Sequence, residues 1–236
     1  MSSDTHKLSV DWQYVSTSLD EKGYAVIPDI LSEAECNTAR SFYNDPAVIY
    51  RSKINMARYN FGEGEYKYFA YPLPDIVQKL RETYYPYLAV IANAWNDRLR
   101  LDNRWPLQLE NLTEQCHEAG QSRPTPLILK YNKQGYNCLH QDLYGPIHFP
   151  LQIVVMLSNP DTDFTGGELI LVEQRPRMQS RPVVLNLRQG SAAIIPVKER
   201  PRRGRLGYHR AIMRHGVSEI LEGERVTMGI IFHDAQ

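Results

Sequence analysis

The positions of two histidines and one aspartate constrain the fold of this chain more than any other feature. His140 and Asp142 are two residues apart, and His215 follows 75 residues after His140. Side chains at positions i and i+2 of a β-strand project to the same face, so His140 and Asp142 can converge on one ion while Gln141 points away. His215 can join them only from a distant strand on the same wall of the fold. The spacing therefore favours a sheet or barrel in which strands far apart in the sequence are neighbours.

The second half of the chain has the composition of such a β structure. From Pro124 onward, short β-rich runs alternate with turn residues such as Asn159-Pro160 and Gly166-Gly167. The expected strands are 127–131, 138–143, 151–157, 168–172, 183–187, 191–197, 211–217 and 226–232. Short strands at this spacing are typical of a sandwich or barrel rather than of βαβ units. We expect an eight-stranded, double-sheet jelly roll.

The first half is expected to be mostly helical. Ser32, followed by Glu33 and Glu35, has the form of a helix N-terminus and predicts a helix over 32–44. Apolar residues at three- and four-residue steps predict a second helix over 75–101, which Pro86 should kink or split. The glycine-punctuated, aromatic stretch 59–66 is expected to be a loop.

We therefore predict one domain over residues 1–236, which is mainly β with a helical N-terminal flank. Residues 1–122 would form the mostly helical flank and a lid, and residues 123–236 the β core. A chain of this length buries a full core without disulfide staples. Its three cysteines are too few and too scattered for a disulfide framework, and free thiols in a reducing cytoplasm are the simplest interpretation.

Two imidazoles and one carboxylate are the ligand set of a non-haem Fe(II) centre, because they fill one face of an octahedral metal and leave the other open. His-X-Asp alone is a weak signal, and the other histidines are more often packed or solvated than metal-bound. The signal is strengthened by Arg225, ten residues after His215, which precedes an almost wholly apolar run. A charge in such a place needs a partner, and an anionic co-substrate on iron would need a fixed cation at its far end.

Taken together, these residues resemble the Fe(II)- and 2-oxoglutarate-dependent dioxygenases, whose fold is a double-stranded β-helix. The resemblance covers about 123–234, roughly half of the chain. Residues 127–140 look like the strand pair that precedes the first metal ligand in the prolyl-hydroxylase type. Residues 164–169 look like the turn and strand that follow the large apolar strand, and 215–217 and 225–227 look like the distal-ligand and carboxylate-clamp strands.

This resemblance implies Fe(II), 2-oxoglutarate and O₂ as cofactor and co-substrates, with hydroxylation of a substrate and release of succinate and CO₂. His140, Asp142 and His215 would be the catalytic metal ligands. Arg225 would hold the 5-carboxylate of 2-oxoglutarate, since its planar fork can donate two parallel hydrogen bonds. Tyr131 would add a hydrogen bond to the same co-substrate.

The substrate is left open by these residues. Strings over 140–145, 173–178 and 213–217 resemble a bacterial subfamily proposed to act on nucleic-acid bases, whereas the ten-residue gap to Arg225 resembles the prolyl-hydroxylase side of the superfamily more than the alkylation-repair side. A small-molecule, nucleobase-type or peptidyl substrate therefore remains possible. Tyr144, Gln152 and Arg214, next to ligands or on a neighbouring strand, are the candidates for substrate contact.

Positive charge is concentrated in one segment, although the formal net charge of the chain is zero. Residues 175–214 hold ten arginines and Lys198 against one acid, Glu199. Such clustering can be an electrostatic footprint for phosphates, so nucleic acid is a possible partner through this segment. Binding of nucleic acid is not favoured over the alternative, in which the segment is a solvated loop whose charges pair with the acidic N-terminal half. Part of the segment, 198–205, is expected to be a flexible loop near the rim of the site.

Other classes of function have less support. The polar N-terminus lacks the apolar stretch of a secretory signal, and no run approaches the ~20 apolar residues that span a bilayer, so we expect a cytoplasmic protein without a membrane partner. A cupin-like protein that binds a metal without redox chemistry would not need Arg225. A metal-free jelly-roll interaction module would need none of the three ligands.

Overall fold

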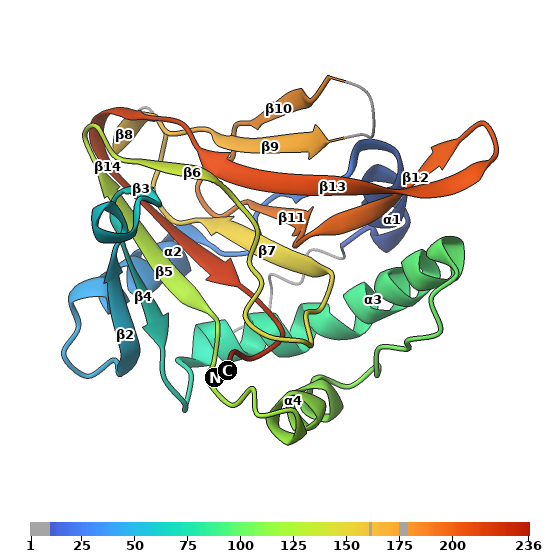
Figure 1. The fold of residues 1–236 in the computed structure, drawn as a ribbon. Coiled ribbons are helices and arrows are strands. Elements are labelled where there is room, and N and C mark those ends of the chain that lie inside the picture. The colour runs from blue at the N-terminus through green and yellow to red at the C-terminus, as the bar shows by residue number, and fades with distance from the viewer. Residues whose placement is uncertain (1–9, 161, 175–178) are drawn as a thin grey trace.

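Two antiparallel sheets face each other in the computed structural model, which describes residues 10–160, 162–174 and 179–236 (Figure 1). The larger sheet consists, in spatial order, of β1 (Ala25–Ile27), β11 (Ala192–Pro196), β7 (Leu151–Met156), β14 (Ile220–Ile230), β5 (Leu127–Asn132), β4 (Glu65–Phe69) and β2 (Tyr50–Asn55), with β8 (Phe164–Gly166) paired to β14. The smaller sheet consists of β10 (Arg181–Leu185), β9 (Leu169–Gln174), β13 (Gly207–Val217), β6 (Tyr136–His140) and β3 (Gly62–Glu63), with β12 (Glu199–Gly204) paired to β13. The expected mainly-β, double-sheet jelly roll is confirmed.

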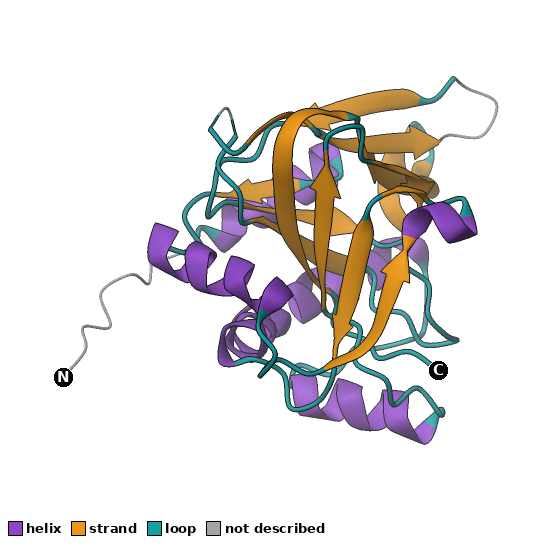
Figure 2. Ribbon diagram, turned by 90° about the vertical axis from the view of Figure 1, so that its left-hand side faces the viewer, coloured by secondary structure: helices purple, strands orange, loops and turns teal. Residues whose placement is uncertain are grey.

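The helices cover the outer face of the larger sheet (Figure 2). They are α1 (Trp12–Lys22), α2 (Glu33–Ser41), α3 (Asp75–Leu99) and α4 (Leu109–Glu118), with the short turns η1 (Phe42–Asn44) and η2 (Met56–Tyr59). Side chains alternate between the two faces of β14, so this strand contributes to both the core under the helices and the core between the sheets. Val226 and Met228 pack in the core under the helices, whereas Arg225 lies near Tyr131, which belongs to the separate core between the sheets. The inner face of β14 is therefore free to carry polar groups.

The predicted helix starting at Ser32 is confirmed. The Ser32 side chain accepts from the Glu35 backbone N–H, while the Glu35 side chain accepts from the Ser32 backbone N–H. This reciprocal capping satisfies two donors that a helix N-terminus otherwise leaves free. Pro86 was expected to kink or split the second helix, and it does not split it, since α3 runs without interruption from Asp75 to Leu99. Buried side chains on both sides of Pro86, such as Tyr85 and Leu88, anchor the helix and offset the lost hydrogen bond.

Two segments that were expected to be loops are strands instead. Within 59–66, β3 pairs with β6 and the start of β4 pairs with β5, so the N-terminal half extends both sheets. Residues 199–204 form β12, which pairs with β13. In β12 the buried Arg200 guanidinium donates to the Glu173 carboxylate from Nη2 at 2.6 Å and from Nε at 3.1 Å. A charged sequence can form this strand because its buried arginine has an acid partner.

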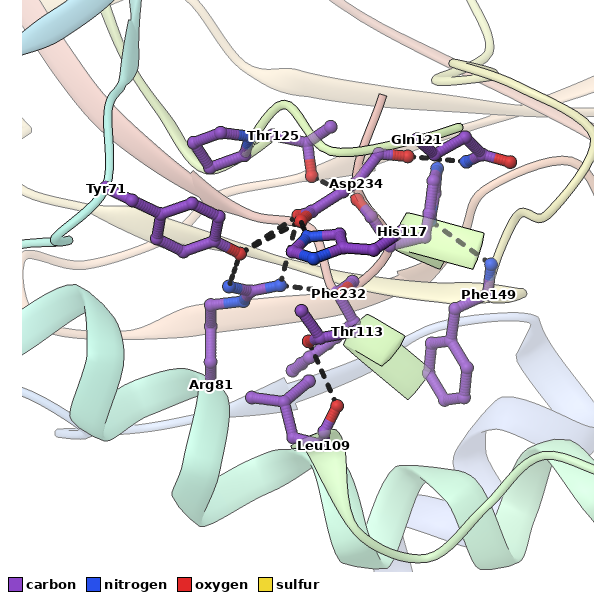
Figure 3. Close-up of polar contacts among 12 residues, drawn as sticks. Tyr71, Arg81, Leu109, Thr113, His117, Gln121, Thr125, Phe149, Phe232 and Asp234 are labelled. Carbon is purple, nitrogen blue, oxygen red and sulfur yellow. Dashed lines mark hydrogen bonds and ion pairs between the residues drawn. The ribbon is translucent and has the colours of Figure 1, made fainter. Parts of the chain in front are cut away.

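The last residues described are tied to the helical layer through Asp234 (Figure 3). The buried Asp234 carboxylate accepts from the Tyr71 hydroxyl at 3.0 Å and lies 2.9 Å from His117 Nε2. Arg81 Nη2 lies 3.7 Å from the same carboxylate and donates to the Phe232 carbonyl at 2.7 Å. These contacts join the end of β14 to α3 and α4, so the helices fix the strand on which Arg225 lies.

None of the helices in the described ranges is long and apolar enough to cross a membrane. Cys36, Cys116 and Cys138 are free thiols. The cytoplasmic location stays a prediction.

We expect His233 to make the fold sensitive to acid. Its side chain is buried, its Nδ1 accepts from the Phe149 backbone N–H at 3.1 Å, and burial lowers its pKa to about 4 from a usual 6.5. Below about pH 6.5 the unfolded chain takes up a proton that folded His233 refuses until about pH 4. The free energy of unfolding should therefore fall by roughly 2 to 3 kcal/mol from this group between pH 7 and pH 4.5.

Urea denaturation of the unaltered protein and of His233→Asn at both pH values measures this contribution. Asparagine keeps an acceptor for the Phe149 N–H but does not titrate, so the variant should lose less stability on acidification. Equal losses in the two proteins would contradict the prediction.

Candidate metal centre

The two histidines lie directly opposite each other on neighbouring strands of the smaller sheet. His215 in β13 is in register with His140 at the end of β6, and their ring centroids are 4.3 Å apart. Asp142 Oδ2 lies 3.2 Å from His215 Nε2, and Asp142 Oδ1 lies 3.6 Å from His140 Nε2. One ligand atom from each of the three residues lies within 4.8 Å of the others. The structure therefore brings the three predicted ligands together.

The route by which Asp142 reaches the site differs from the expected one. The strand was expected to run over 138–143, with Asp142 on the same face as His140, but β6 ends at His140. Gln141 holds the following bend, because its Nε2 donates to the carbonyls of Lys198 at 2.8 Å and Met213 at 2.9 Å. The chain leaves the ladder at this point, so a fixed turn rather than strand alternation places the carboxylate.

Two residues that were predicted to touch substrate contact the carboxylate of the predicted metal ligand Asp142. The Tyr144 hydroxyl donates to Asp142 Oδ1 at 2.8 Å, and Gln152 Nε2 donates to Asp142 Oδ2 at 2.8 Å. The Tyr68 hydroxyl in turn donates to the Tyr144 hydroxyl at 2.9 Å. Partners of this kind fix the orientation of a metal ligand. A direct substrate contact by Tyr144 or Gln152 stays a prediction.

The environment of Asp142 and His140 favours their metal-binding forms. Burial acts to raise the pKa of Asp142, but the neighbouring imidazoles of His140 and His215 and its hydrogen bonds hold that pKa well below its usual range. Burial, followed by the nearby His215, lowers the pKa of His140. Its Nδ1 lies 2.8 Å from the Cys138 carbonyl, which leaves Nε2 for an ion. Neutral imidazoles and an ionised carboxylate are what a divalent metal requires, and this donor set fits Fe(II).

Arg225 is fully buried between the sheets with most of its hydrogen-bonding capacity unused. Nη1 lies 3.4 Å from the Thr227 hydroxyl, whereas Nε and Nη2 have no partner among the described residues. Burial lowers the pKa of Arg225 to about 10, which still leaves it charged at neutral pH. An unpaired buried cation is costly. The Nε–Nη2 edge therefore fits a carboxylate that the protein itself does not provide.

The surroundings of Arg225 leave room beside it. Tyr131 is its cross-strand neighbour in β5, and the guanidinium carbon lies 5.6 Å from the Tyr131 ring centroid. Gly167 adopts a left-handed φ of +64°, and a Cβ there would lie 2.9 Å from Arg225 Cδ. A cavity of about 260 Å³, lined in part by Gly167 and Phe164, lies beside this position.

Tyr131 has the properties of a neutral hydrogen-bond donor. It is fully buried, and burial raises its pKa to about 12, so the hydroxyl keeps its proton at neutral pH. Its oxygen accepts from Asn137 Nδ2 at 3.2 Å, so the proton of the hydroxyl remains available. Its role toward a co-substrate is a proposal developed below.

Arg214 does not join this group. Along β13, Met213 and His215 are buried while Arg214 is exposed, so strand alternation directs Arg214 to the opposite face. Its predicted contact with substrate remains untested and has no support from this placement.

The basic segment 175–214 is partly neutralised, although residues 175–178 lie outside the described residues. Glu173 pairs with Arg200 and Arg202, and Glu199 lies 3.4 Å from Arg210 Nε. Arg203 and Arg205 remain exposed near the β12–β13 turn.

Sequence reasoning missed the residues that support the site. Tyr68 and Gln141 act through hydrogen bonds to other side chains or backbone groups, and the sequence gives no spacing signal for such contacts. Asn137 could have been found, because it precedes His140 by three residues on the strand that was compared with the known family.

Comparison with protein families gives a match over residues 64–235 to Oxygenase-NA, described as an oxygenase catalysing oxidative methylation of damaged DNA. Two curated proteins from Mycobacterium tuberculosis, the uncharacterized proteins Rv2227 (strain H37Rv) and MT2286 (strain CDC 1551), are each 47% identical over 167 residues. The aligned region covers 71% of this chain and 72% of each relative.

Solved structures resemble this fold at low sequence identity. A prolyl-4-hydroxylase from Pseudomonas putida has a TM-score of 0.56 at 12% identity and covers 95% of this chain and 100% of its own. An oxidoreductase of the 2OG-Fe(II) oxygenase family from Burkholderia pseudomallei has a TM-score of 0.53 at 12% identity, with 95% and 92% covered. At such identity these similarities show the fold, and they confirm the double-stranded β-helix.

Tyr144→Phe should weaken metal binding while leaving the fold intact. The change removes the donor to Asp142 Oδ1 but keeps the ring, and loss of such a partner costs on the order of 10- to 100-fold in metal affinity. Titration with Mn(II), followed by electron paramagnetic resonance, measures the affinity.

Tyr136→Phe is the matched control, because this half-exposed hydroxyl on β6 has no hydrogen bond among the described residues. An unchanged affinity in Tyr144→Phe would show that Asp142 does not need this support.

Proposed function

Since this chain belongs to the Oxygenase-NA family and is a Fe(II)- and 2-oxoglutarate-dependent oxygenase, we propose that it binds 2-oxoglutarate through Arg225 and Tyr131 and hydroxylates a nucleobase. The overall reaction consumes 2-oxoglutarate, O₂ and a substrate C–H bond, and gives succinate, CO₂ and a C–OH bond. One observation carries the proposal. A buried arginine with an unpaired edge lies on the larger sheet, which faces the smaller sheet on which His140 and His215 are paired.

Arg225 would receive the 5-carboxylate of 2-oxoglutarate. Its unpaired Nε and Nη2 match the two oxygens of a carboxylate, and a bidentate pair of this kind is both strong and directional. Burial removes competing water and strengthens the pairing. The Tyr131 hydroxyl, which keeps its proton, would donate to the same carboxylate. The far end of the co-substrate would thereby be fixed.

His140, Asp142 and His215 would hold Fe(II), which when bound supplies the oxidative decarboxylation of 2-oxoglutarate and the oxidation of the substrate. The protein's residues then have positioning roles. Tyr144 and Gln152 keep the Asp142 carboxylate in one orientation. Three protein ligands would leave room on the ion for the co-substrate. The protein thus provides orientation and a dry site, while the cofactor provides the chemistry.

A nucleobase is the substrate class that the available observations favour. The family description names damaged DNA. Tyr66, Tyr68 and Tyr144 form a cluster of edge-to-face rings next to Asp142. Aromatic side chains of this kind are suited to contact an unstacked base, since every base offers a π face. Small-molecule and peptidyl substrates are the alternatives that the experiment below separates.

Arg225→Gln should raise the 2-oxoglutarate concentration needed for half-maximal succinate release by about 100-fold or more. Loss of one partner from a buried charge pair costs roughly 2 to 5 kcal/mol. Arg225→Lys keeps the charge but not the planar fork, so its effect should be intermediate. Mn(II) affinity should be unchanged in both. Arg188→Gln, an exposed arginine after β10, is the control. If Arg225→Gln needs no more 2-oxoglutarate than the unaltered protein, another residue binds the 5-carboxylate.

A succinate-release screen under air tests the substrate class. We expect nucleobases, nucleosides or oligonucleotides to stimulate release above the uncoupled rate, and Asp142→Ala to abolish it. Stimulation by amino acids or peptides alone would overturn the nucleobase proposal. Absence of any release, with 2-oxoglutarate left intact, would favour a cupin-like protein without redox chemistry.

A further inference from the structure

A cleft of about 570 Å³ is lined by residues at the start of β2, just after the end of β4 and in the segment that leads into β5. Its lining includes Arg51, Ser52, Tyr71, Ser122, Arg123 and Pro124. It is a separate space from the cavity beside Arg225, since the two share no lining residue. The metal centre as described above makes no use of it.

Two arginines give this cleft a positive charge that the protein does not neutralise. Within the described part of the chain, no carboxylate lies within ion-pair distance of Arg51 or Arg123. The nearby Asp234 instead faces Arg81 and His117. Burial is the largest influence on Arg51 and lowers its pKa, and the charge of Arg123 acts in the same direction. Tyr68, Tyr144 and Asp234 act to raise that pKa. Two like charges that share one cleft are stabilised by an anion between them.

Arg51 is held in a fixed position, whereas Arg123 is exposed. Arg51 Nε donates to the Pro124 carbonyl at 2.6 Å, and the guanidinium carbon lies 4.1 Å above the Tyr68 ring centroid. The terminal nitrogens of Arg51 have no hydrogen-bond partner among the residues that the structure describes. A guanidinium fixed by stacking and one hydrogen bond loses little side-chain entropy when it binds a ligand.

The cleft is connected to the metal centre through two tyrosines. Tyr68, on which Arg51 stacks, donates its hydroxyl proton to the Tyr144 hydroxyl, and Tyr144 donates to Asp142. A ligand anchored at Arg51 is therefore next to the aromatic cluster that leads to the metal ligands.

We propose that the cleft between Arg51 and Arg123 binds the phosphate of the nucleotide whose base is oxidised. Two separate guanidinium groups suit a phosphate, because each can take one of its non-bridging oxygens. This inference rests on the proposed nucleobase hydroxylation. It adds a phosphate subsite to that reaction and makes a phosphate-bearing substrate preferable to a free base or nucleoside. The phosphate belongs either to a free nucleotide or to a nucleic-acid strand, and the experiment below distinguishes them.

Competition binding with the full-length, Mn(II)-loaded protein tests the subsite. A fluorescein-labelled single-stranded DNA hexamer is the probe, and thymidine 5′-monophosphate, thymidine and inorganic phosphate are the competitors. We expect the monophosphate to compete at least tenfold better than thymidine. If only the hexamer binds, and neither the monophosphate nor inorganic phosphate competes, the phosphate recognised is that of a strand.

Arg123→Gln should weaken hexamer binding about fivefold or more and reduce its dependence on salt, while Arg123→Lys should retain most of the affinity. Arg123 is exposed, so its replacement leaves packing unchanged. Arg51→Gln should weaken binding further, with circular dichroism as the check that the fold is intact. Arg205→Gln, an exposed arginine in the β12–β13 turn, is the matched control and should bind like the unaltered protein.

Equal binding by the Arg123→Gln and unaltered proteins would overturn the subsite, as would a failure of the unaltered protein to bind any probe. A loss in Arg205→Gln but not in Arg123→Gln would place the phosphate contact on the basic segment instead. Failure of the proposed base oxidation can be told apart from failure of the phosphate subsite. If the protein releases no succinate but still binds phosphate in a manner that depends on Arg123, the subsite stands and only its link to base oxidation is lost.

Discussion

The direct pairing of β6 with β13 is the contact on which the metal centre depends. It places His140 opposite His215, and it fixes the point at which the chain leaves the ladder to present Asp142. The strand pairing brings His140 and His215, 75 positions apart in the sequence, close enough for their side chains to bind one ion. A shift of one residue in this register would turn one imidazole to the opposite face of the sheet. The positions of the two imidazoles therefore depend directly on the register of β6 and β13.

The second constraint is the charge enclosed between the sheets. Arg225 is fully buried, and two of its nitrogens have no partner within the described ranges. Such an arrangement reduces the stability of the protein without ligand, and a carboxylate that binds there restores the missing interactions. The unpaired Arg225 therefore lowers the stability of the ligand-free protein and at the same time makes the site selective for an anion of matching length. The helical layer compensates through apolar packing on the outer face of the same strand.

The sequence predicted the ligands and most strands of the core, because these depend on local alternation and on a few residue types with specific chemistry. It did not predict β1 to β4 or β12. β1 has only three residues, β3 contains glycine, and β2, β4 and β12 carry charges, so these strands owe their conformation to pairing with neighbours. It also did not predict that Tyr144 and Gln152 donate hydrogen bonds to Asp142. Hydrogen bonds between side chains from different elements depend on three-dimensional packing, and a single sequence contains no period or spacing that reports them.

The position of β14 has a consequence for how the protein is made. This strand pairs with β5, β7 and β8, all of which precede it in the chain, and it carries Arg225. During synthesis, the partner strands leave the ribosome before the strand that joins them, and their edges stay open in the meantime. Contacts of such long sequence separation form slowly, and open edges invite pairing with other chains. The nascent chain is thus most exposed to aggregation just before its central strand arrives, and chaperones have their largest effect on yield in that interval.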